Sequence, residues 1–453
     1  MIELRDTCLR KQLAAVPDFD RYATVDELAV AARQLAATHP DRTRLRHIGT
    51  SRLGEALECL TIRGGPRAAV VFALPHPNEP VGGLTAIHLA TTLCQDEQLQ
   101  PALGFTWHIV PCIDPDGTRL NEGWFAGPLT RGHYARNFYR PAYDEQVEWT
   151  FPVSYKRRRF DRALPETQAL MRLIDETAPA LLVSLHNSET GGVYYYLSQP
   201  QPELYGVLHA IPHSLGLPLD VGEPEAPYIP VLAPAIYQMM RSQDEYEFVE
   251  RTGGDPAFAT AGASSAEYAE RHGTLSLVCE APQWVDARAH DATPSDRGYA
   301  DVLYEQADAL AELGETLGGA LRTVEPDLRA DSPYLRASRF FAARIGSLPG
   351  ELLHRAKEDA NQRPATVAEC YSCDDLVHLH RLRLGGMLLR AIDGELGIGN
   401  TTAAIRTTRA GFAARYDDWI VEAELDTPPL PAEIRSLVAT QFGAIIATAT
   451  HIG

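Results

Sequence analysis

The stretch AAVVFALPHPNEP at residues 68–80 decides the fold of this chain, because an apolar run passes directly into a loop with metal-binding side chains. The run is short, contains β-branched residues and is closed by prolines, which predicts a buried strand that ends in a loop. His76 and Glu79 lie three residues apart in that loop. At a strand end, an imidazole and a carboxylate can turn toward one metal ion, and zinc takes nitrogen and oxygen ligands at about 2.0–2.2 Å. The pair alone is a weak pattern, so a third ligand and a general base must come from elsewhere.

The composition of the 453 residues is that of a globular protein with a large core. Apolar residues make up 45% and charged residues 22%, and this length predicts two or three domains. The net charge of −19 argues against nucleic acids and anionic membranes as partners. No apolar run reaches the roughly 18 residues that span a bilayer. Seven scattered cysteines and an N-terminus without a signal-peptide core predict a cytoplasmic protein.

Apolar runs of strand length alternate with helical patterns over the first 300 residues. Strands are expected within 45–62 (two strands around a turn) and at 68–74, 104–111, 180–185, 193–197 and 275–279, and helices at 20–45, 80–95 and 165–177. This alternation predicts an α/β fold with a largely parallel sheet and ligands at the strand ends. Residues 118–162 are irregular, aromatic and basic, and a loop of that length is either functional or disordered.

The region after about residue 326 contains several amphipathic helical patterns and few strand signals. We therefore expect a catalytic domain over residues 1–325 and a separate α-helical domain over residues 326–453. The helical domain is expected either to cover the active site or to form the interface of a homo-oligomer.

A second histidine and a second glutamate stand at the ends of two further apolar runs. His186 ends the run at 180–185, and Glu280 follows the run at 275–279. Together with His76 and Glu79, His186 gives two imidazoles and a carboxylate, which leave the fourth zinc position open for water, as in catalytic sites. Such a water is a nucleophile at neutral pH. Hydrolysis also needs a carboxylate outside the ligand set to move the proton of this water, and Glu280 is the best-placed candidate.

The order of these motifs between about residues 20 and 322 resembles that of the zinc carboxypeptidase family, the group that includes carboxypeptidase A. The matching motifs are residues 22–28, the turn at 49–54, His76-x-x-Glu79, residues 114–117, 135–138, 165–167 and 184–186, and Glu280. The resemblance implies a three-layer α/β/α sandwich with a mixed, mostly parallel sheet of about eight strands. It also implies one zinc ion per chain, held by His76, Glu79 and His186, with Glu280 promoting the water.

The resemblance implies further roles for two sets of arginines. Arg136 matches the arginine that forks onto the terminal carboxylate of the substrate, a task that suits a planar guanidinium, although a surface ion pair is the plainer interpretation. Arg131 and Arg119 are both candidates for the arginine that stabilises the tetrahedral oxyanion. The expected substrate is a peptide or an N-acyl amino acid with a free carboxylate.

Three positions depart from the family pattern. Ala135 replaces an asparagine that precedes the carboxylate-binding arginine, and His133 falls where an acidic residue supports a zinc-bound histidine. Phe258 aligns with the tyrosine that closes over the substrate, and it has no hydroxyl group. These changes leave the four hydrolytic residues intact but affect the positions that recognise an ordinary peptide with a free C-terminus.

Two other functions remain open. The 78–80 segment also resembles the zinc loop of the succinylglutamate desuccinylase and aspartoacylase group, which implies a deacylase of N-acyl amino acids as an alternative. The three altered positions also motivate a catalytically silent zinc protein that binds partners through its helical region. The longer N-terminal match and the 165–167 motif favour the peptidase.

Two smaller features have a plain and a functional interpretation. Cys370 and Cys373, with His378 and His380 nearby, could form a second metal site, but their spacing is too short for a zinc finger, and buried helical residues are the favoured interpretation. The basic run at 156–159 is expected to be a solvated face, and its alternative role is to attract an acidic substrate.

Overall fold

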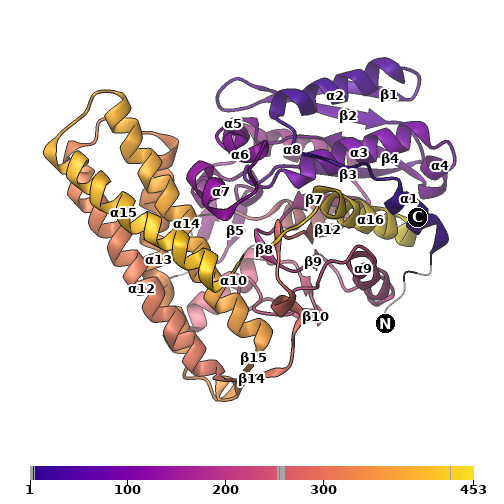
Figure 1. Cartoon of the computed structure of the whole chain (residues 1–453). Coiled ribbons are helices and arrows are strands. Elements are labelled where there is room, and N and C mark those ends of the chain that lie inside the picture. Colours follow the sequence, from indigo (N-terminus) through magenta and orange to yellow (C-terminus); the bar gives the residue numbers. More distant parts are fainter. Residues whose placement is uncertain (1–3, 5, 253–254, 256–260, 429) are drawn as a thin grey trace.

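Nine strands form one twisted sheet in the order β1-β2-β4-β3-β7-β12-β9-β11-β10 (Figure 1). The computed structural model describes residues 4, 6–252, 255, 261–428 and 430–453. The strands are β1 (Thr43–Thr50), β2 (Ala56–Ile62), β3 (Arg67–Ala73), β4 (Phe105–Val110), β7 (Leu181–His186), β9 (Tyr194–Leu197), β10 (Val231–Ala233), β11 (Ile236–Gln238) and β12 (Leu275–Glu280). The central strands β4, β3, β7 and β12 run parallel. Strands β1 and β2 pair antiparallel with their neighbours, and β9 pairs antiparallel with β12 but parallel with β11.

Helices cover both faces of this sheet and complete three layers. One face packs against α3 (Val81–Gln95), α9 (Pro202–Ser214) and α16 (Ile434–Ile452), and the other against α8 (Pro165–Thr177) and α11 (Ser265–Ala269). Because the central strands are covered on both sides, they are largely apolar, and every residue of β7 is buried. The predicted α/β/α sandwich with a mixed, mostly parallel sheet is confirmed.

Most elements predicted before residue 200 lie within a few residues of their expected bounds. The helix expected at 20–45 is shorter, because Thr24 and Glu27 form a capping box at the start of α2 (Val25–Thr38) and the helix ends at His39. Residues 199–257, for which no helix or strand was predicted, contain α9, β10, β11 and α10 (Ser242–Arg251). Strands of three residues, such as β10 and β11, are too short to show a period in sequence.

Four long helices pack together at one end of the sheet (Figure 1). They are α12 (Tyr299–Val324), α13 (Pro333–Arg355), α14 (Val367–Gly397) and α15 (Ala403–Asp426). The last helix, α16, leaves this group and lies between α3 and α9 on the sheet. The helical C-terminal region is confirmed, while the domain boundary near residue 325 stays a prediction, because α12 begins before it and α16 packs on the sheet.

The remaining elements are short or peripheral. They are α1 (Thr7–Ala14), α4 (Leu99–Leu103), α5 (Pro115–Arg119), α6 (Glu122–Phe125), α7 (Arg131–Asn137), β5 (Val153–Tyr155), β6 (Arg158–Phe160), β8 (Thr190–Gly191), β13 (Trp284–Val285), β14 (Pro294–Gly298), β15 (Pro364–Thr366) and β16 (Leu430–Pro431). Of the helices in the described part of the chain, none has both the length and the hydrophobicity required to cross a lipid bilayer.

Candidate metal centre

Three neighbouring strands bring the predicted ligands and Glu280 to one edge of the sheet. Parallel pairing aligns β3 with β7 and β7 with β12, so their carboxyl ends lie together. After β3 the chain turns at Leu74, whose φ of 57° lies in the left-handed region that side-chain-bearing residues rarely adopt. This turn directs the loop with His76 and Glu79 toward His186 at the end of β7.

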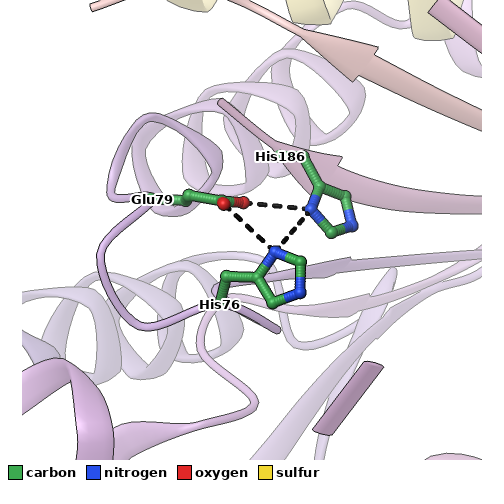
Figure 2. A group of neighbouring side chains, drawn as sticks. All are labelled: His76, Glu79 and His186. Atoms are coloured by element: carbon green, nitrogen blue, oxygen red, sulfur yellow. Dashed lines mark hydrogen bonds and ion pairs between the residues drawn. The ribbon is translucent and has the colours of Figure 1, made fainter. Parts of the chain in front are cut away.

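His76, Glu79 and His186 meet at a single point (Figure 2). His76 Nδ1 lies 3.0 Å from Glu79 Oε1, His186 Nδ1 lies 3.0 Å from Glu79 Oε2, and the two Nδ1 atoms are 3.1 Å apart. Ligands that bind zinc tetrahedrally at about 2.0 Å are about 3.3 Å from one another. The three side chains are buried, and among the described residues they form the group whose donor atoms could share one metal ion.

The hydrogen bonds of His186 show that its Nδ1 lone pair faces this point. The Ser184 hydroxyl group has one proton, which it donates to Glu148 Oε2 at 3.1 Å. Ser184 Oγ therefore accepts the hydrogen bond that joins it to His186 Nε2 at 2.7 Å. In a neutral imidazole, Nδ1 then carries no proton and faces the Glu79 carboxylate. Two lone pairs 3.0 Å apart repel unless a cation or a proton lies between them, and the residues therefore fit a bound metal ion.

The pKa shifts of the cluster reflect the same need for positive charge. Burial, assisted by the Arg140 guanidinium, lowers the pKa of His76 to about 3. Burial opposes ionisation of Glu79, but the imidazoles of His76 and His186 outweigh it and hold the pKa of Glu79 well below its ordinary value. The Glu79 carboxylate in turn outweighs burial at His186 and raises its pKa. A metal ion and a proton thus compete for His186.

Glu280 lies beside this cluster without belonging to it. It ends β12 directly opposite His186 in the sheet register, and its Oε1 is 3.9 Å from His186 Nδ1. Its side chain is buried, and burial is the main reason why its pKa lies well above the ordinary value. The negative charges of Glu79 and Glu225 raise this pKa further. A buried carboxylate with a raised pKa is suited to accept and hold a proton.

Three further residues that sequence analysis missed support the cluster. Arg140 donates to Glu79 Oε1 at 2.8 Å. The only sequence feature that pointed to a role for Arg140 was its position in the irregular, basic loop at 118–162. Glu148 accepts from Ser184 and from the Ser265 backbone and hydroxyl groups. Gln441 of α16 donates to the backbone carbonyl groups of His186 and Cys279. For Glu148 and Gln441 the sequence holds no local signal.

The two arginines predicted at the oxyanion do not contact the cluster. Arg131 is buried and pairs with Asp375 of α14 at 2.8 Å. Arg119 pairs with Asp26 at 2.8 Å and with Glu55 at 2.7 Å. The structure therefore joins both guanidinium groups to carboxylates elsewhere, and their predicted role stays a prediction.

Of the two predicted substrate-binding residues, the structure describes Arg136, which pairs with a residue of the helical region and not with the metal ligands. Arg136 donates to Asp417 of α15 at 2.7 Å and lies over the ring of Tyr416. Its side chain is half exposed, which matches the plain ion-pair interpretation. Phe258 falls outside the described residues. His133, predicted to replace an acidic support, is on α7, whereas the carboxylate near His186 is that of Glu148.

The two smaller features have structural explanations. The basic run at 156–159 is matched by carboxylates on and after α10, through Lys156–Glu250, Arg157–Asp255 and Arg158–Glu245 ion pairs of 2.6–2.9 Å. Cys370 and Cys373 are buried on α14. His378 pairs with Asp426, and His380 contacts Arg383. No metal-binding group that includes these cysteines occurs in the described ranges.

The family model of the zinc carboxypeptidases matches residues 28–269. Among solved structures, the metallo-carboxypeptidase from Burkholderia cenocepacia is 16% identical with a TM-score of 0.35, and the match covers 61% of this chain and 63% of that one. The present chain thus spans less than two thirds of that relative.

Two further structures are similar at the same low level. Carboxypeptidase A from Helicoverpa armigera is 15% identical, with a TM-score of 0.37 and coverage of 78% of this chain and 81% of that chain. The murein-tripeptide amidase MpaA from Escherichia coli O157 is 20% identical, with a TM-score of 0.27 and coverage of 53% and 88%. A search of curated proteins found no match. With the family model covering more than half of its length, the chain belongs to the zinc carboxypeptidase family.

Proposed function

We propose that this protein is a zinc-dependent hydrolase that cleaves an amide bond next to a carboxylate-bearing residue of a peptide. The observation that carries this proposal is the meeting of His76, Glu79 and His186 at one point, with Glu280 beside them and outside the ligand set. Membership of a family of zinc peptidases supports the same reaction class.

Each of the four residues has a separate task in this proposal. His76 and His186 would hold zinc through Nδ1 and Glu79 through its carboxylate. A zinc ion held there supplies a Lewis acid that activates water and polarises a carbonyl group. Glu280 accepts the proton of the attacking water on its carboxylate and passes it to the leaving amine, and its raised pKa allows it to carry the proton between the two steps.

Arg140 is the cation that we propose for stabilising negative charge on the substrate. It is the arginine that hydrogen-bonds to a metal ligand, since its Nη1 lies 2.8 Å from Glu79 Oε1. Arg119 and Arg131 remain alternatives for this role. Binding of the substrate carboxylate by Arg136 also remains a proposal, and it requires Arg136 to leave Asp417.

The reducing, cytoplasmic location expected from the sequence is also part of the proposal. All seven cysteines are free in the structure, which supports a protein that does not depend on disulfides.

The test compares two substitutions in the cluster. Glu280→Gln should keep zinc but reduce hydrolysis of a blocked peptide by about 10²–10⁴-fold, because the amide cannot accept the proton. Glu79→Gln should lose zinc, and Glu203→Gln, an exposed position on α9, should change neither property. Hydrolysis by Glu280→Gln at the native rate would contradict the assigned role.

The same assay separates the alternatives. A panel of blocked peptides and N-acyl amino acids distinguishes a peptidase from a deacylase by which group is hydrolysed. Tight zinc binding without turnover of either group would instead support the silent binding protein.

A further inference from the structure

A cluster of tyrosines with one carboxylate lies next to Glu280 on the same face of the sheet. Strand β9 pairs antiparallel with β12, and the register places Tyr194 opposite Glu280 and Tyr196 opposite Val278. Because alternate residues of a strand point to the same face, these four side chains share one face. Any group bound over Tyr194 and Tyr196 would therefore be a direct neighbour of the proposed general base.

Three tyrosine rings form the floor of this cluster. The rings of Tyr194, Tyr196 and Tyr237 have centroids 5.7–6.1 Å apart. Apolar side chains pack around them, including Ile229 and Met239. Tyr196 is only 5% exposed, and its buried hydroxyl group lies close to the Glu225 carboxylate but makes no hydrogen bond of ordinary distance and angle to a described residue. A buried hydroxyl without such a hydrogen bond needs an explanation, and a bound ligand would supply one.

Glu225 places a negative charge beside these rings. It is exposed, and Tyr194 Oη donates to its Oε1 at 2.8 Å. Burial is the main reason why the pKa values of Tyr194 and Tyr196 are raised, and the negative charge of Glu225 is the second. The Glu225 carboxylate therefore lies close to both rings. Within the described part of the chain, neither lysine nor arginine forms an ion pair with Glu225, which leaves its charge free to meet a ligand.

The chemistry of the cluster favours a cation on an aliphatic chain. The faces of phenol rings attract cations, and a carboxylate pairs with ammonium or guanidinium through charge-assisted hydrogen bonds. Apolar side chains can cover the methylene groups that such a cation carries in lysine or arginine. An acidic substrate group would instead be repelled by Glu225.

We propose that Glu225, Tyr194 and Tyr196 form a subsite that binds the lysine or arginine side chain of a peptide substrate, adjacent to the bond that is cleaved. This inference rests on the hydrolase function proposed above and adds a substrate class to it. Glu225 contacts the cation, Tyr194 holds the carboxylate in place, and Tyr196 provides the floor.

The test uses blocked peptides that contain either lysine or norleucine, which share the same methylene chain and differ in the ammonium group. One pair carries the residue on the amino side of the scissile bond and a second pair on the carboxyl side. With zinc-loaded native protein, kcat/KM should favour lysine over norleucine by about 10- to 100-fold in at least one pair. Glu225→Gln should reduce that preference, the ratio of the two kcat/KM values, to less than about threefold, and because Glu225 also raises the pKa of Glu280, this ratio and not the absolute turnover is the readout. Glu203→Gln is the matched control and should keep the preference.

Binding of the same peptides, measured by calorimetry on native and Glu225→Gln protein, separates this inference from the proposed function. If no peptide is hydrolysed, the hydrolase proposal fails, and a lysine preference in binding that disappears in Glu225→Gln still supports the subsite. Equal behaviour of lysine and norleucine in turnover and in binding overturns the subsite, as does a lysine preference that survives Glu225→Gln.

Discussion

Gln441→Met tests whether the last helix holds the metal centre in place. Gln441 is fully buried on α16, and its amide NH₂ donates to the carbonyl oxygens of His186 and Cys279. Its amide oxygen accepts from Thr85 Oγ1 at 2.7 Å. One side chain thus ties together the ends of β7 and β12, the strands that lead to a metal ligand and to the proposed general base.

Methionine has a similar length but makes none of these three hydrogen bonds. Each contributes about 0.5–1.5 kcal/mol net, so we expect the free energy of unfolding to fall by about 1.5–4.5 kcal/mol. This is a large part of the about 5–15 kcal/mol that stabilises an ordinary protein. Because His186 loses a backbone restraint, zinc affinity should also weaken by about 10- to 100-fold, as for other residues that orient metal ligands.

Urea unfolding followed by circular dichroism, with chelator competition for zinc, measures both effects. The matched control is Thr448→Val on the same helix, since the Thr448 hydroxyl is buried without a partner among the described residues. That control should change the free energy of unfolding by less than about 0.5 kcal/mol or raise it slightly. A Gln441→Met protein as stable as the control would refute the reasoning.

Three further substitutions test two arginines and a histidine that are buried or partly buried. Arg131→Met leaves the buried Asp375 carboxylate unpaired, so urea unfolding should show a loss of about 3–5 kcal/mol, while the folded fraction still binds zinc. Arg140→Met removes a guanidinium that lowers the pKa of His76, so zinc should dissociate at a higher pH during acidification, and kcat/KM should fall at least about tenfold. Burial, together with the charge of Arg383, lowers the pKa of His380 to about 3. In the unfolded chain the same imidazole takes up a proton near pH 6.5, so the free energy of unfolding falls as the pH drops from 6.5 toward 3. His380→Leu should make that decline smaller, as measured by urea unfolding at several pH values.

The sequence predicted which residues meet at the candidate metal centre because most of them carry a local signal. His76, His186 and Glu280 are polar residues at the exits of apolar strands, and parallel pairing brings such exits to one edge of a sheet. The strand runs are long enough to recognise, and their order limits the possible topologies. The local sequence pattern and the tertiary geometry agree at these positions, so the position of each residue at a strand end was sufficient to predict that they lie close together.

Arg140, Glu148 and Gln441 could not be placed in this way. Each contacts the site through tertiary packing, and its partner lies far away in sequence, as with Gln441 and His186, which are 255 residues apart. An arginine or a glutamine has the same appearance in sequence whether it is solvated or buried against a ligand. Their function follows from packing that no local period encodes.

The sequence predicts part of the placement of α16. Its residues from 437 to 449 are all buried, and a helix that is apolar on every side must be surrounded by protein. The sequence therefore predicts that this helix is covered, but not that α3, α9 and the sheet cover it. The expected domain of residues 326–453 grouped it with its neighbours in sequence instead.

The C-terminal helices restrain the ligand segment from two directions. On one side α16 holds the backbone of His186 through Gln441. On the other side α14 holds Glu189, three residues later, through Arg383 at 2.6 Å. A segment fastened at both sides keeps its metal ligand in one orientation, which lowers the entropy lost when the cation binds. We infer that α14 and α16 are part of the functional site, because Gln441 on α16 positions a ligand and Arg383 on α14 restrains the loop that follows it.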